Sequence, residues 1–390
     1  MAYTVTESKS WFKRISESFG GIITGFVLIA AGTWLLWWNE ERTFNTAGAI
    51  GEAELVTQNV EDVSRVDPSL EGKVIHATDR AETKDVLRDP MFGIETSAIN
   101  LRRNAEYYQW QEETHRETRK KLGGGEETVT TYTYSPEWVQ SPIDSNKFED
   151  PSYRGRNVIL ADVKDETFWA GNVSFGAYKL PDFLKHSIGG ETSMTLESPD
   201  MRQLESFINV PSGYTARDLI HVQGGTVYIG ANPGTPSIGD VRITFTKTPP
   251  AEVSLIAKVV RDSFEPFRAS NGYSFSRLSM GVVSSEKMFE GARSDNNLMA
   301  WILRVVGILC VIFGLRLIFR PLSVIADVIP ILGTIVEAGA GIVAMILGLA
   351  WSMCVIAVAW VRFRPLIAGG LIAGALVLVV LLYMKGRKAQ

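Results

Sequence analysis

Long apolar runs interrupt an otherwise polar chain and determine the architecture that we expect. The first run covers residues 20–38, which contain no charged side chain. As a helix it would measure about 28 Å, close to the thickness of the hydrocarbon layer of a bilayer. Basic residues precede the run and three tryptophans close it, which predicts a transmembrane helix with its N-terminal side in the cytoplasm. A cleaved signal peptide is the alternative, because residues 47–49 have cleavage-site character, but the bulky tryptophans favour an uncleaved anchor.

The C-terminal region is mostly apolar and predicts three further crossings. Residues 298–319 form the second transmembrane helix. The next apolar region would be about 57 Å long as a single helix, which exceeds one crossing, and Pro330 and Gly333 offer a break. We therefore expect these segments in order: an interfacial or re-entrant segment at 322–332, a third helix at 338–361, a fourth at 366–384 and a basic tail at 385–390.

Four crossings place both termini in the cytoplasm and residues 43–297 on the opposite side, which is periplasmic or lumenal. The basic residues near the N-terminus, in the tail and at Arg316 and Arg320 agree with the positive-inside rule. Arg362 and Arg364 oppose it, since they fall in a short outer loop. The fold class predicted is an α+β membrane protein with four transmembrane helices and a β-rich extracytoplasmic domain inserted between the first two.

Residues 1–19 precede the first span and are expected to stay in the cytoplasm. Their apolar residues, Trp11, Phe12, Ile15 and Phe19, recur at helical spacing among charged residues. This pattern indicates a short amphipathic helix at the membrane surface. A frayed tail whose aromatic residues merely flank the anchor is the alternative.

Short alternating segments between residues 43 and 297 predict a β-rich domain. The clearest lie at residues 73–76, 158–163, 226–229, 241–245 and 253–260, separated by Gly, Pro, Asn and Asp. Short helices are expected at 181–187 and 199–207, and a polar helix at 284–297 leads into the second span. Residues 190–215 are a candidate boundary between two lobes.

Residues 101–140 predict a long β-hairpin. Three glycines at 123–125 supply a flexible tip, and the sequence TVTTYTY at 128–134 strongly favours a strand. A turn centred on Gly124 would place Thr118 opposite Thr130, Arg116 opposite Tyr132 and Trp110 opposite Trp138. A charged helix across residues 106–121 is the alternative.

Charge and cysteine content exclude some classes of protein. The chain has 390 residues, with 39 basic and 43 acidic side chains and a net charge of -4, so no overall positive field indicates a nucleic-acid partner. The two cysteines, Cys310 and Cys354, both lie in apolar runs. The β-rich region therefore has no disulfide and depends on its own core.

Motifs for catalysis, cofactors or metals are absent from the sequence. The four histidines are scattered without metal-ligand spacing, and there is no nucleophile elbow, zinc-protease motif, phosphate-binding loop or dinucleotide-binding motif. Residues 284–287 match S-x-x-K, a pattern that is short enough to occur by chance. The expectation is a protein that is not an enzyme and has no catalytic, cofactor or metal site.

Two patterns within the apolar runs indicate helix packing. Glu337 lies near the inner interface at about the level of Arg316, and ionisable residues at such depth usually face protein and form pairs. We therefore expect an ion pair between Glu337 and Arg316, with a simply hydrated glutamate as the alternative. The spacings Gly21-x-x-x-Gly25 and Gly370-x-x-x-Gly374 are typical of closely packed transmembrane helices, within or between subunits.

Several short sequences, taken in order, resemble a known family. They are Gly72-Lys73-Val74-Ile75-His76; Asp89-Pro90 and Gly93; Leu101-Arg102-Arg103, Glu106 and Tyr108-Gln109-Trp110; Tyr132, Tyr134 and Glu137-Trp138; Gly239-Asp240-Val241-Arg242 and Phe245; Pro321-Leu322, Asp327 and Pro330; and Arg364-Pro365-Leu366. With these residues the chain resembles LUMA, the transmembrane protein forty-three family. The resemblance implies four spans, a large domain between the first and second, and cytoplasmic termini.

The resemblance also implies a kind of function. Animal members look like proteins of the endoplasmic reticulum and inner nuclear membrane that self-associate and join lamina-linked membrane complexes. Similar sequences occur in bacteria, where no lamina exists, and we expect a bacterial member here. The chain lacks the longer basic N-terminal tail of the animal members, which argues against nuclear partners.

The function that we expect is a membrane scaffold that self-associates and presents a β-rich recognition domain. Its partners would be the lipid bilayer, further copies of the chain and other membrane proteins, with no nucleic acid. The residues expected to act in assembly or recognition are Arg102, Arg103, Tyr108, Trp110, Tyr132 and Trp138. The alternative is a membrane-anchored sensor or receptor for a lipid or a small envelope ligand.

Overall fold

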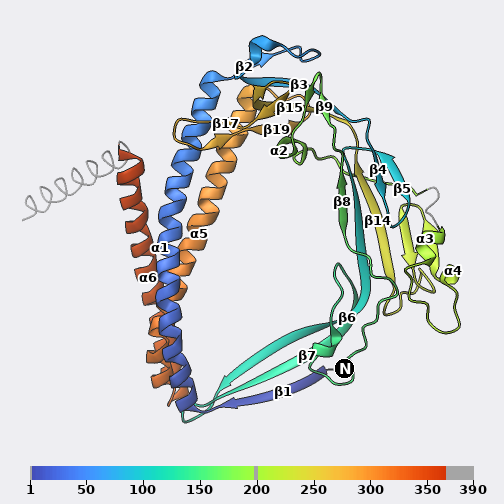
Figure 1. Cartoon of the computed structure of the whole chain (residues 1–390). Coiled ribbons are helices and arrows are strands. Elements are labelled where there is room, and N and C mark those ends of the chain that lie inside the picture. The colour runs from blue at the N-terminus through green and yellow to red at the C-terminus, as the bar shows by residue number, and fades with distance from the viewer. Residues whose placement is uncertain (1, 197–200, 366–390) are drawn as a thin grey trace, which may run out of the picture.

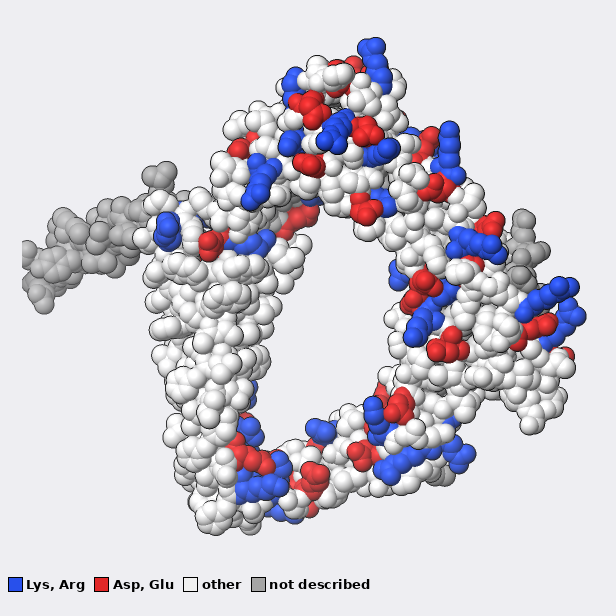
Figure 2. All heavy atoms as spheres, viewed as in Figure 1, with Lys and Arg blue, Asp and Glu red and all other residues white. Residues whose placement is uncertain are grey.

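The structure is a computed structural model that describes residues 2–196 and 201–365. Three long helices, α1, α5 and α6, lie along one side, and a β-rich region lies along the other (Figure 1). The two sides meet at both ends, so the chain forms a closed ring around an open centre (Figure 2). The combination of apolar helices and β-sheets confirms the predicted α+β class.

All three long helices exceed the spans expected from the sequence. Helix α1 covers Trp11–Val56, α5 covers Ser285–Ala326 and α6 covers Pro330–Phe363, and each is long and apolar enough to cross a membrane. The 46 residues of α1 measure about 69 Å. The predicted fourth helix at 366–384, the tail at 385–390, and Gly370 and Gly374 lie outside the described residues.

The segment expected at 322–332 is not a separate element. Helix α5 continues through Pro321 to Ala326, a short turn follows, and α6 begins at Pro330. Proline suits the first turn of a helix, where a backbone N–H has no partner within the helix. The break therefore lies before Pro330 rather than at Gly333, and residues 338–361 are the later part of one 34-residue helix.

Helices α1 and α5 approach closely because glycines face each other. A Cβ on Gly25 would lie 2.6 Å from the carbonyl oxygen of Gly314, and a Cβ on Gly32 would lie 2.8 Å from that of Gly307. Such contacts let backbones pack tightly where lipid provides no hydrophobic force between helices. Gly25 thus lies at the contact, whereas a Cβ on Gly21 would meet α5 only at an ordinary 3.8 Å.

Two sheets form most of the β-rich region. The larger has the order β1-β7-β6-β14-β13-β12, with β8 paired to β6 and β11 to β14. The second has the order β10-β9-β3-β15-β16, with β2 paired to β3 and β19 to β15. The strands are β1 Ala2–Lys9, β2 Gln58–Val60, β3 Val74–Glu82, β4 Val86–Asp89, β5 Ile94–Ser97, β6 Asn100–Lys120, β7 Glu126–Val139, β8 Glu166–Trp169, β9 Ser174–Phe175, β10 Tyr178–Lys179, β11 Thr192–Ser193, β12 Ile220–Gln223, β13 Thr226–Ile229, β14 Val241–Thr248, β15 Ala251–Val260, β16 Ser263–Glu265, β17 Phe267–Arg268, β18 Ser274–Phe275 and β19 Arg277–Met280.

Two short helices lie where the sequence predicts them, but one of the predicted strands does not form. Helix α2 (Asp182–Lys185) and helix α3 (Met201–Glu205) lie within the two predicted short helices, and α4 (Ala216–Leu219) follows them. Residues 226–229 form β13 as predicted, whereas residues 158–163 contribute only an isolated bridge at Ala161.

Residues 190–215 do not divide the β-rich region into two lobes. Strands β6 and β14 lie on opposite sides of that segment in the sequence and pair in the first sheet, as β3 and β15 do in the second. One buried core includes Ile243 of the first sheet and Leu255 of the second. The region is therefore organised by long-range strand pairing rather than by successive lobes.

Strands β6 and β7 form the predicted hairpin, which rules out the helical alternative for residues 106–121. The register differs from the expected one by two residues, so Thr118 faces Thr128, and Trp138 faces Tyr108 instead of Trp110. The side chains still alternate on the expected faces because a shift of two residues preserves the alternation.

The glycines of the tip explain this shift. The last pair joins Lys120 to Glu126, so the loop is centred on Gly123 rather than Gly124. Both glycines have positive φ angles, 86° and 81°, which only glycine adopts readily at two consecutive positions.

Residues 2–9 form a strand, whereas residues 11–19, which carry the apolar positions of the expected amphipathic helix, form the first turns of α1. Strand β1 pairs along its whole length with β7 and adds a third strand to the hairpin. Its Thr, Tyr and Val side chains favour extended backbone. Helix α1 begins only at Trp11, after the cap residue Ser10.

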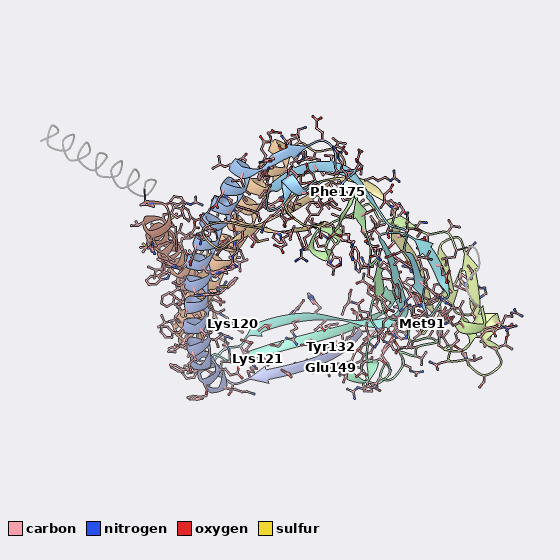
Figure 3. All side chains as sticks on the ribbon, turned by 45° about the horizontal axis from the view of Figure 1, so that its top comes forward. Met91, Lys120, Lys121, Tyr132, Glu149 and Phe175 are labelled. Atoms are coloured by element: carbon pink, nitrogen blue, oxygen red, sulfur yellow. The ribbon has the colours of Figure 1, made fainter. Side chains whose placement is uncertain are left out.

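The hairpin closes the ring by reaching the N-terminal end of α1 (Figures 1 and 3). Strand β6 has 21 residues, about 70 Å of extended chain. At the other end of α1, Ile50 and Ala53 pack against Ile256 of the second sheet. The β-rich region therefore contacts α1 on both sides of the apolar residues 20–38. If α1 crosses a bilayer there, the expected placement of all of residues 43–297 on one side does not hold for the hairpin tip.

The glycine contacts generate a prediction about stability. Gly25→Ala should lower the free energy of unfolding by about 1–3 kcal/mol, because the added methyl group overlaps the backbone of α5. Gly20→Ala is the matched control, since no atom lies within 4 Å of its added Cβ. Thermal unfolding in detergent, followed by tryptophan fluorescence, measures both. Equal midpoints for the two variants would refute the contact.

Candidate functional site

A cavity of about 550 Å³ lies where the hairpin tip meets the helix ends. Figure 3 shows Lys120 and Lys121 at this end of the hairpin, beside the helices. We call the charged residues that line the cavity the hairpin-tip site; they are Arg14, Lys120, Glu126, Arg316, Arg320, Asp327 and Glu337. They come from α1, the hairpin, α5, the turn after it, and α6.

The carboxylate of Asp327 is the centre of the hairpin-tip site. It is 1% exposed and lies between two cations. Arg14 Nη2 is 2.6 Å from Asp327 Oδ2, and Lys120 Nζ is 2.8 Å from Oδ1. Arg14 also contacts Glu126 of β7 at 3.0 Å. A buried carboxylate requires such partners because the loss of its hydration is costly.

Backbone contacts hold the hairpin tip in place around these charges. Arg14 Nη1 donates to the carbonyl of Gly124, and the amide of Gly123 donates to the carbonyl of Val328 at 3.1 Å. The indole of Trp11 packs on Gly124 and occupies the space that a side chain there would need. The tip glycines therefore serve the docking contact as well as the turn.

Glu337 and Arg316 lie near each other, but Glu337 has a closer partner. Glu337 Oε1 is 3.8 Å from Arg316 Nη2, whereas Oε2 is 2.9 Å from Lys120 Nζ. Burial lowers the pKa of Lys120, but its hydrogen bonds to Asp327 and Glu337 outweigh burial and raise the pKa overall. Lys120 therefore stays charged at neutral and mildly alkaline pH.

A second buried ion pair, not expected from the sequence, lies at the other end of the apolar part of α1. Glu40 is 1% exposed and accepts two hydrogen bonds from Arg304 of α5, at 2.6 and 2.9 Å. Trp360 of α6 also donates to Glu40, at 2.8 Å. The sequence did contain a signal for this pair. Glu40 and Arg304 have opposite charges and lie at ends of two apolar runs that meet in the fold, and an ionisable group at such a position usually pairs across helices.

Arg103, expected to act in assembly, is a core residue. Alternation along β6 turns it inward, where it is 3% exposed, while Arg102 faces outward. Arg103 Nη1 lies 2.6 Å from Asp89, which is fully buried, and Nη2 lies 2.8 Å from Glu166. Arg103 thus joins three separate segments and offers no surface to a partner.

The aromatic residues expected to act in assembly all have partners within the chain. The rings of Tyr108 and Trp138 are 5.2 Å apart, and Arg242 lies 4.5 Å above Trp138. Trp110 packs edge-on against Tyr153 at 4.9 Å. Tyr132, which Figure 3 shows on the hairpin, lies 6.3 Å from the ring of Tyr3 of β1. All four are half-buried.

The S-x-x-K match and one of the scattered histidines make structural contacts. Ser284 of the S-x-x-K match is the N-cap of α5 and accepts a hydrogen bond from the backbone of Lys287. His76 contacts the carbonyl of Val283 at 2.8 Å. Within the described residues, no group of three or more His, Cys, Asp or Glu side chains could hold a metal ion.

The three long apolar helices, together with the similarity to known membrane proteins, define this chain as a membrane protein. The family model for transmembrane protein 43 matches residues 107–365. The chain belongs to the transmembrane protein 43 family. Transmembrane protein 43 of Homo sapiens is 27% identical over 394 residues, covering 98% of this chain and 94% of that protein. That of Mus musculus is 27% identical over 390 residues, covering 97% and 92%.

A more distant relative extends the similarity to insects. The transmembrane protein 43 homolog of Drosophila melanogaster is 26% identical over 362 residues, covering 90% of this chain and 91% of that protein. These relatives are animal proteins, so they give no support to the expected bacterial source. No solved structure matches the chain.

The hairpin-tip site generates a prediction about docking. Asp327→Asn should leave Arg14 and Lys120 facing each other without their shared counter-ion, which costs about 3 kcal/mol for a buried pair. Hydrogen–deuterium exchange at residues 121–125 should then become at least about tenfold faster. Glu113→Gln is the control. Glu113 is exposed on β6, the strand that carries Lys120, and forms no ion pair among the described residues. Unchanged exchange in Asp327→Asn would mean that the charges do not hold the tip.

Proposed function

We propose that this protein is a non-enzymatic membrane scaffold that self-associates through its β-rich arm, our name for the β-rich region with its two sheets. The observation that supports this most directly is the free edge of β1. This strand ends the larger sheet, and among the described residues it pairs with β7 alone. An unpaired edge of eight residues rich in Thr, Tyr and Val is suited to adding a strand from another copy. Two copies meeting edge to edge about a two-fold axis would form one continuous sheet.

We further propose that the helices cross the bilayer four times, with both termini on the cytoplasmic side. The three apolar helices and the apolar residues 366–384 supply the crossings. Most of the β-rich region would then lie outside the cytoplasm, where it is available to recognise other membrane proteins. The bilayer itself is the remaining partner.

The closed ring gives an independent reason for self-association. The middle of the hairpin exposes polar and charged side chains, including Glu113, His115, Arg116 and Glu117. Such side chains cannot lie in hydrocarbon, because their charges would lose hydration without compensation. A docked hairpin therefore requires protein or water, rather than lipid, inside the ring. Several copies arranged with their apolar helices facing lipid would provide that environment.

Deletion of residues 2–9 tests the role of β1. The deletion should reduce the mass of the detergent-solubilised particle to that of a single chain, measured by light scattering. The unfolding midpoint should change little, since α1 retains its cap at Ser10. The double variant Thr4→Ser/Thr6→Ser, which keeps the edge backbone, should retain the larger mass. A deletion variant with the same mass as the full chain contradicts the proposed interface.

Cysteine labelling tests on which side of the membrane the hairpin tip lies. In a chain with Cys310 and Cys354 replaced by Ser, we expect Leu122→Cys at the exposed tip to react with an impermeant maleimide from the same side as Phe12→Cys. Val66→Cys, in the β-rich region, should react from the opposite side. Labelling of positions 122 and 66 from one common side would show that the hairpin is undocked in the membrane.

The second candidate function, a sensor or receptor for a lipid or small envelope ligand, has weaker support in the β-rich region. The cavities beside His76 and beside Trp138 measure about 310 and 270 Å³, which is at or just below the lower limit for small-molecule sites. Retention of a ligand of fixed mass by the purified protein, seen in native mass spectrometry, would favour this alternative.

A further inference from the structure

The hairpin-tip site has an excess of positive charge and two cations that are still accessible. Four basic and three acidic side chains line its cavity. Asp327 and Glu126 both contact Arg14, and Lys120 lies between Asp327 and Glu337. Each carboxylate that faces the cavity therefore already has a cation beside it.

The accessible cations are Arg316 and Arg320. They are one helical turn apart on α5, so they share a face of that helix. The side chain of Arg316 is 56% exposed, and its contact with Glu337 is long at 3.8 Å. Arg320 is exposed and forms no salt bridge among the described residues. Two adjacent guanidinium groups can bind a phosphate through several charge-assisted hydrogen bonds.

The position of the cavity determines which phosphate compound would reach it. Arg316 and Arg320 lie at the end of the apolar run 298–319, where a transmembrane helix leaves the hydrocarbon. The same cavity has an apolar wall formed by Phe313, Leu317 and Val324. A polar end and an apolar wall match the two parts of a membrane lipid, and basic pockets between transmembrane helices are suited to anionic headgroups.

We propose that this cavity binds the phosphate of an anionic membrane lipid through Arg316 and Arg320, with an acyl chain along Phe313 and Leu317. The lipid occupies the leaflet at the N-terminal end of α1. Its headgroup lies beside the hairpin, since Thr118 and Lys120 line the same cavity. The proposal does not depend on self-association.

Native mass spectrometry of the full chain in detergent tests the proposal, with phosphatidylglycerol and phosphatidylcholine added at equal concentration. The wild-type chain should retain phosphatidylglycerol preferentially. The variant R316Q/R320Q should bind it at least about tenfold more weakly, because each basic residue near the surface adds to the attraction. R316K/R320K keeps both charges and should retain most of the binding, which separates loss of charge from loss of folding.

The matched control is R362Q, which removes an exposed arginine at the far end of α6 and should not change binding. Inorganic phosphate added at millimolar concentration should not displace the lipid. Equal retention of phosphatidylglycerol by the wild type and R316Q/R320Q, or equal retention of phosphatidylcholine and phosphatidylglycerol by the wild type, would overturn the proposal. Displacement by inorganic phosphate would overturn the lipid assignment and leave a site for free phosphate.

Discussion

The buried carboxylate of Asp327 is the interaction on which the closed form of this protein depends. It is 1% exposed and lies between Arg14 of the helical side of the ring and Lys120 of the β-rich side. A carboxylate in such a position is stable only while both cations remain, because its hydration has been lost. The turn between α5 and α6, the start of α1 and the tip of a hairpin about 70 Å long are thus held at one point. The hairpin glycines allow that contact, since a side chain on Gly124 would collide with Trp11.

A second ion pair helps to hold the long helices in a fixed arrangement. Glu40 and Arg304 pair at one end of the apolar part of α1, and Arg14 and Asp327 pair at the other. Arg14 and Glu40 are about 39 Å apart along the helix, somewhat more than the hydrocarbon thickness. Between them, facing glycines bring α1 and α5 into backbone contact. The helices are therefore fixed along their length by close packing and at both ends by charge, so a β-rich arm anchored at either end is carried by a rigid support.

In the topology that we propose, this arrangement would link the bilayer to the arm. The hairpin-tip site lies where α5 leaves its apolar run, so the residues that dock the arm would then meet the headgroup region of the membrane. The scaffold role that we propose would need a recognition surface held at a constant height and angle, and a three-point contact among α1, the arm and the α5–α6 turn would provide that constraint. The free edge of β1 is held within the same arm, beside β7, and this position would orient it for the pairing with a further copy that we propose.

The sequence by itself determined the classes of element and the family. Residues 20–38, the TVTTYTY strand and the short strand at 226–229 were predictable, because hydrophobic period and β-propensity are local properties. The tertiary structure alone decided which charges pair: Asp327 is 313 residues from Arg14, and Asp89 and Arg103 were separate motifs until the fold buried them together. It also turned residues 2–9 into a strand, since the unpaired edge of β7 supplies the hydrogen-bond partners that a strand there requires. The two-residue shift in the hairpin has the same origin, because the register depends on where two consecutive left-handed glycines place the turn, and hydrophobic alternation is unchanged by a shift of two.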